Sequence, residues 1–128
     1  MTVTDYQTTL RLLAVRDNAF VERALASETA NRAESALDEL TYAFVRLAVM
    51  ISVGASVQSL RPIVEAAEEA GATREQIVGT LVAAMPATGV PRIVATAPAI
   101  GLSLDYDVFD ALEQPGHAHV PTTWEEPR

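Results

Sequence analysis

Arginine side chains interrupt two apolar, helix-like stretches of this 128-residue sequence. Arg46 lies within the apolar run 43–51, and Arg92 is the only formal charge in the run 77–104. A guanidinium in such surroundings needs a carboxylate or another anion as its partner. Arg46, Arg61 and Arg92 are therefore candidates for binding the carboxylate of a substrate. The structural alternative is a salt bridge between subunits or a side chain that extends to water. We favour this alternative for Arg92, and for Arg46 the two interpretations are equal.

Proton transfer would need a second group beside such an arginine. Tyr42 lies four residues before Arg46, so both fall on one face of a helix. A phenol there could act as a general acid, although a tyrosine at an interface is more often simply packed. His117 and His119 are the only histidines, and histidine is the side chain that ordinarily titrates near neutral pH. His117 is a candidate for acid–base catalysis, whereas His-x-His without a third ligand does not predict a metal site.

The composition excludes several kinds of chemistry. The chain has no cysteine, which rules out thiol nucleophiles, disulfides and cysteine-ligated metal centres. It has no glycine-rich phosphate loop and no hydrolase nucleophile elbow, so we expect no cofactor. A net charge of −8 disfavours nucleic acid as a partner. Residues 1–5 lack the basic and apolar segments of a secretion signal, and we expect a cytoplasmic protein.

Apolar residues recur at helical spacing along most of the chain, without the alternation of β-strands. One helix face is formed by Leu40, Phe44, Leu47, Ala48 and Ile51. Ser56 is an expected N-cap, and Thr73 with Gln76 forms an expected capping box. We predict an all-α fold with a single helical domain over 1–112 and an extended tail over 113–128.

The apolar run 77–104 is long enough to cross a bilayer. It contains three prolines, which predict two shorter helices, one ending near Met85 and one beginning near Arg92, with a turn over 86–91. Buried helices of an oligomer are therefore the preferred interpretation, and a membrane is not an expected partner.

Three segments, in this order, resemble the carboxymuconolactone decarboxylase / alkylhydroperoxidase D family. They are Leu37–Val49, Ala66–Ile77 and Ala87–Pro91, and together they define a family-like core over 37–104. The resemblance implies an all-α subunit of the alkylhydroperoxidase D-like type that assembles into homo-oligomeric trimers or hexamers. It also implies a pocket near the start of the central helix and the subunit interface.

The chain departs from this family at the reactive positions. The Cys-x-x-Cys pair of the peroxidase branch falls on Ser56 and Ser59, and the histidine falls on Ile63. A register shifted by one residue supplies no thiol either, so peroxide reduction by the family's disulfide exchange is excluded. Ser56 and Ser59 are candidates for hydrogen bonds to a substrate, with helix capping as the alternative. Arg61 matches an arginine of the decarboxylase branch, and Ile63 would line the same pocket.

We therefore predict a cofactor-independent enzyme of the lyase or isomerase type, acting on a small carbonyl, lactone or polyketide-like substrate. An arginine would hold an anionic oxygen while Tyr42 or His117 moves a proton. The alternative is a non-catalytic ligand-binding or scaffold oligomer that has lost the family's active site. The expected partners are a small-molecule substrate and further copies of the chain.

Overall fold

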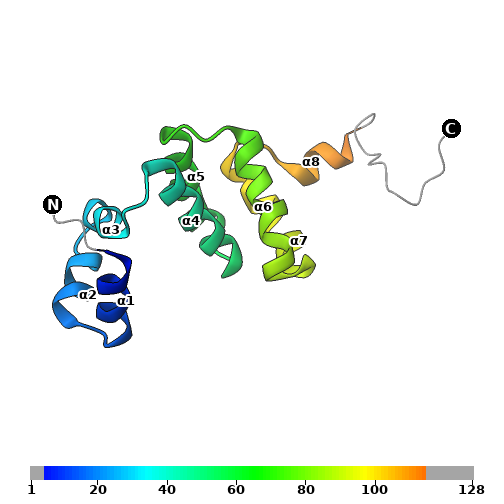
Figure 1. Cartoon of the computed structure of the whole chain (residues 1–128). Helices are drawn as coiled ribbons and strands as arrows, with labels where there is room; N and C mark the ends of the chain where they lie inside the picture. Colours follow the sequence, from blue (N-terminus) through cyan, green and yellow to red (C-terminus); the bar gives the residue numbers. More distant parts are fainter. Residues whose placement is uncertain (1–4, 115–128) are drawn as a thin grey trace. The chain divides into compact units, whose positions relative to one another are not determined.

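The computed structural model in Figure 1 describes residues 5–114, which form eight helices and no strand. The helices are α1 (Tyr6–Ala14), α2 (Asn18–Leu25), α3 (Glu28–Ser35), α4 (Glu39–Ser52), α5 (Val57–Glu69), α6 (Arg74–Thr88), α7 (Val90–Ser103) and α8 (Val108–Glu113). The predicted all-α fold is confirmed. The chain divides into two compact units, one ending at Ala43 and the other beginning at Phe44. Each unit is described by itself, and the single domain expected over 1–112 stays a prediction.

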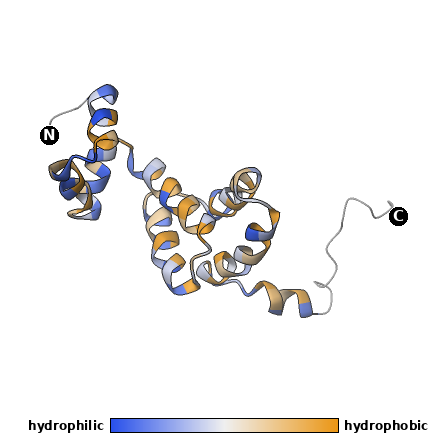
Figure 2. Ribbon diagram, turned by 90° about the horizontal axis from the view of Figure 1, so that it is seen from below, coloured by the Kyte–Doolittle hydropathy of each residue, from blue (hydrophilic) through white to orange (hydrophobic). Residues whose placement is uncertain are grey.

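The first unit consists of short helices that begin at capping side chains. Asp5, Asp17 and Ser27 each accept a hydrogen bond from the backbone N–H three residues later. Phe20 and Tyr42 are its large buried side chains. Hydrophilic residues are frequent in these N-terminal helices, whereas hydrophobic ones dominate the helices of the second unit (Figure 2).

Asp38 caps the start of α4 with an unusually well bonded carboxylate. The backbone N–H of Thr41 and the Thr41 hydroxyl donate to it at 2.8 and 3.0 Å. The first of these bonds, helped by the second, lowers the pKa of Asp38 below its ordinary value. A carboxyl whose pKa is lowered by folding stabilises the protein when the pH is above its ordinary pKa of about 4. This stabilisation is lost as the pH falls through the lowered pKa.

We expect Thr41→Val to raise the pKa of Asp38 toward its ordinary value, because one of the two donors is removed. Carboxyl chemical shifts followed through an acid titration measure this change directly. Asp5 is the matched control, since the Thr8 N–H lowers its pKa in the same way. An unchanged Asp38 titration, or an equal change at Asp5, would contradict the assignment.

The second unit is built around α7, which packs against both α5 and α6. Its fully buried large side chains are Leu47, Ile51, Leu60, Val64, Ile77 and Ile100. The predicted caps are present: Ser56 begins α5, and Thr73 and Gln76 exchange both capping-box hydrogen bonds at the start of α6. No described helix is long and apolar enough to cross a membrane.

The break between α6 and α7 lies at one residue, and the predicted turn over 86–91 is wrong in its extent. Pro86 lies inside α6, which continues to Thr88. A proline removes one N–H from the hydrogen-bond ladder and disturbs the preceding turn, but α6 accepts this cost and continues for two residues beyond Pro86. Gly89, with φ +92°, makes the change of direction instead.

Candidate functional site

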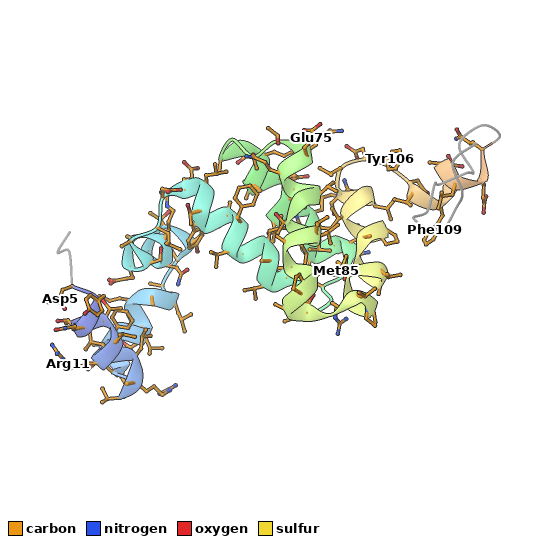
Figure 3. The ribbon with its side chains drawn as sticks, turned by 45° about the vertical axis from the view of Figure 1, so that its right-hand side comes forward. Asp5, Arg11, Glu75, Met85, Tyr106 and Phe109 are labelled. Atoms are coloured by element: carbon orange, nitrogen blue, oxygen red, sulfur yellow. The ribbon has the colours of Figure 1, made fainter. Side chains whose placement is uncertain are left out.

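A hollow of about 370 Å³ lies beside the start of α7 and is lined by Thr88, Pro91, Arg92 and Ala95. Its size is within the range of small-molecule sites. All four residues lie beside the Gly89 break, since Thr88 directly precedes it and the other three follow it, so the hollow lies where α7 starts. Met85 is labelled near the C-terminal end of α6 in Figure 3 and shows the region of the hollow. Its carbonyl accepts a hydrogen bond from the Gly89 N–H at 2.9 Å.

Arg92 is the charged group of this hollow. Among residues 5–114 its guanidinium takes part in no hydrogen bond and no ion pair. Its side chain is exposed, so the charge is hydrated and is not a buried defect. An exposed, unpaired guanidinium at the edge of a partly apolar hollow can bind an anion through two parallel N–H donors.

The end of the Arg92 side chain lies at the turn between α4 and α5. A Cβ atom on Gly54 would overlap Nη1 of Arg92 and would lie 3.0 Å from Cζ. Gly54 has φ +69° and precedes the N-cap Ser56 by two residues. The fold therefore brings Arg92 to the segment that carries Ser56, although the two are far apart in the sequence.

Ser56 and Ser59 are exposed and are used locally. The Ser59 N–H donates to Ser56 Oγ at 3.3 Å, and the Ser56 hydroxyl donates to Ser59 Oγ at 3.3 Å. Both hydroxyl groups thus form hydrogen bonds within the first turn of α5, and Ser56 has the capping role that the sequence offered as the alternative. Ser59 Oγ can still donate a hydrogen bond to a ligand.

Arg61 connects α5 to the segment that follows α7. Its guanidinium donates to the Leu102 carbonyl at 2.8 Å and to Asp105 Oδ1 at 3.2 Å. Such an exposed ion pair contributes little to stability, about 0–1 kcal/mol. It does occupy the guanidinium, so Arg61 has a structural partner where a substrate carboxylate was proposed.

Tyr42 belongs to the first unit and is buried. Its hydroxyl donates to Asn31 Oδ1 at 2.7 Å, and Asn31 Nδ2 donates to the Ala24 carbonyl at 2.7 Å. This chain of bonds joins α4 to α3 and to the end of α2. Arg46, in the second unit, is half-buried and has an interaction partner within the protein.

The remaining candidates are Ile63 and His117. Ile63 is half-buried on α5. His117 lies outside the described residues, as does most of the predicted tail. Within the described residues no group of three or more potential ligands is placed to hold a metal ion.

The hollow itself was not predicted from the sequence. Gly54, Thr88, Pro91 and Ala95 carry no chemical signal in the sequence. Arg92 was selected for its charge alone. Nothing in the sequence pairs Gly54 with Arg92, because their contact depends on how α5 and α7 pack.

The described residues are thus all-helical, and they form a hollow without any thiol beside one arginine. The model of the carboxymuconolactone decarboxylase family matches residues 18–100, so the chain belongs to this family. The match includes Gly54, Ser56 and Arg92. The predicted resemblance is confirmed, and with no cysteine in the chain the thiol chemistry of a peroxidase is not available. No curated protein and no solved structure matches the chain.

Proposed function

We propose that this chain is a cofactor-independent enzyme of the lyase or isomerase type, acting on a small organic acid with a carbonyl or lactone group. The observation that carries the proposal is the guanidinium of Arg92, which lies beside the hollow and has no partner among residues 5–114. Family membership supports the reaction class, since the family is named for a decarboxylase. The absence of cysteine directs the proposal away from redox chemistry.

The lining of the hollow suits such a substrate. Arg92 supplies a planar pair of donors that matches a carboxylate or an enolate oxygen. Pro91 and Ala95 offer apolar contact to the carbon skeleton. The Thr88 hydroxyl donates to the Ala84 carbonyl at 3.1 Å, which leaves its oxygen free to accept a hydrogen bond.

Proton transfer is assigned to His117 in this proposal. Decarboxylation or isomerisation through an enolate requires a group that moves one proton at the reacting carbon. Tyr42 is a weaker candidate than the sequence indicated, because its hydroxyl already donates to Asn31. Histidine titrates near neutral pH without special tuning, and His117 is one of two in the chain.

Purified protein incubated with a small-molecule extract of its source, and compared by mass spectrometry with a boiled control, tests the proposal. We expect one acid to disappear and one product to appear in equal amount, with a mass difference of carbon dioxide for a lyase or of zero for an isomerase. His117→Ala is expected to reduce the rate by a factor on the order of 10² or more, the usual contribution of a general acid or base. An unaltered rate in His117→Ala would remove that residue from the mechanism.

A second candidate function is the binding of a small acid without turnover. The observation favouring it is that Tyr42 and Arg61, two expected active groups, are engaged in structural hydrogen bonds. In the same experiment a compound that stays with the protein but is chemically unchanged would support this candidate against the enzyme.

A further inference from the structure

We infer that Gly54 is the positioning residue for Arg92, and that the empty space at its Cα sets the direction in which the guanidinium meets a carboxylate ligand. The inference rests on the carboxylate site proposed above and adds a second residue to it. It concerns a residue from another segment, in the turn between α4 and α5.

The contact is specific to one end of the guanidinium. A Cβ built on Gly54 would have Nη1, Cζ and Nε of Arg92 as its three nearest neighbours, with Cζ at 3.0 Å and Nε at 3.6 Å. Nη2 is therefore farther from that Cβ position than the other three atoms.

The conformation of Gly54 explains why this position lacks a side chain. Its φ of +69° lies in the left-handed region, which asparagine also adopts at modest cost. Conformation alone would thus accept asparagine. A Cβ at this position would overlap Arg92, and because the overlapping atoms are the end of a flexible side chain, Arg92 would be displaced before the backbone.

The position of the guanidinium also points to an anion. Gly54 lies two residues before the N-cap of α5, and the N-terminus of a helix carries a partial positive charge. A cation held near this end is disfavoured until a negative ligand neutralises it. Holding Arg92 there in advance reduces the side-chain freedom that binding would otherwise have to remove.

The test compares two glycines that share a positive φ. Gly71 has φ +105° and open space where a Cβ would lie, so Gly71→Asn introduces a side chain without displacing Arg92. The probe is benzoate, with benzamide as its neutral analogue of similar shape, titrated into the full chain and followed by amide NMR shifts. We expect Gly54→Asn to weaken benzoate binding at least fivefold and Gly71→Asn to change it less than twofold.

The Arg92→Ala background separates a steric effect from any other. With Arg92 removed, Gly54→Asn should produce no further loss of benzoate binding, whereas independent effects would add. If Gly54→Asn alone fails to fold, the double variant should fold, because the overlap is gone. Additive losses, or no rescue of folding, would overturn the inference.

A second measurement tests the positioning role of Gly54 independently of whether the carboxylate site exists. The Nε–H relaxation of Arg92, measured without ligand at pH 6, should report an ordered side chain in the wild type and a mobile one in Gly54→Asn. If wild-type protein shows this order but does not bind benzoate, the proposed carboxylate site fails and the positioning role stands. Equal mobility in both proteins would overturn the positioning role.

Discussion

Arg92→Ala is expected to weaken benzoate binding by a factor of roughly 10 to 150, which corresponds to the loss of a charged hydrogen-bonding group worth about 1.5–3 kcal/mol. Among the described residues, the Arg92 guanidinium is the only charged side chain that lines the hollow beside α7. Removing it leaves Thr88, Pro91 and Ala95, none of which distinguishes an acid from its neutral analogue by charge. Benzoate should therefore bind the variant no better than benzamide does.

Arg61→Gln is the matched control for this experiment. Arg61 belongs to the same unit and carries the same group, but its guanidinium is bound to Asp105 and to the Leu102 carbonyl. We expect this variant to bind benzoate as the wild type does. A loss in Arg61→Gln together with unchanged binding in Arg92→Ala would exchange the roles of the two arginines.

Arg92→Lys adds a test of geometry. Lysine keeps the positive charge but presents a point-like ammonium in place of a planar fork. We expect intermediate binding, weaker than wild type and stronger than Arg92→Ala. Wild-type affinity in Arg92→Lys would mean that charge alone, and not the orientation set at Gly54, governs recognition.

The contrast between these arginines shows where inference from the sequence stopped. Arg46, Arg61 and Arg92 were all candidates for binding a carboxylate, and a structural role was favoured for Arg92. The three arginines differ in their contacts with residues that are distant in the sequence. Arg61 finds Asp105, a distant residue in the sequence, and Arg92 reaches Gly54, so only the packing of α5 against α7 shows which guanidinium is occupied.

Local features were predictable for the opposite reason. The capping box of Thr73 and Gln76 and the N-cap Ser56 depend on residues within one helical turn, and both are present. The end of α6 was misplaced because a proline and a glycine competed as breakers. Pro86 lies inside α6 without ending it, and the positive φ of Gly89 decided the boundary.

Leu60→Ala is expected to produce the largest loss of stability, about 2–5 kcal/mol, because it removes a fully buried side chain and leaves a cavity. Small domains have total stabilities of about 5–15 kcal/mol, so the loss is a large fraction of the whole. Urea unfolding followed by circular dichroism measures it as a lowered midpoint with an unchanged slope.

Leu102→Ala is the control of identical chemistry, since Leu102 on α7 is 38% exposed. Its truncation should lower the free energy of unfolding by much less than that of Leu60. Equal losses at the two positions would show that Leu102 is covered in solution by another copy of the chain. Leu102 would then be more buried in the predicted homo-oligomer than in a single chain.

The same core positions both parts of the candidate site. Leu60 lies one turn after Ser56 on α5, and Ile93, which is buried, directly follows Arg92 on α7. Because α5 and α7 pack together, the turn that holds Gly54 and the helix that carries Arg92 are fixed by shared apolar contacts. A cavity at Leu60 should therefore also loosen Arg92 in the Nε–H relaxation experiment, whereas Leu102→Ala should leave that signal unchanged. Order at Arg92 that survives in Leu60→Ala would place the positioning in the Gly54 contact alone.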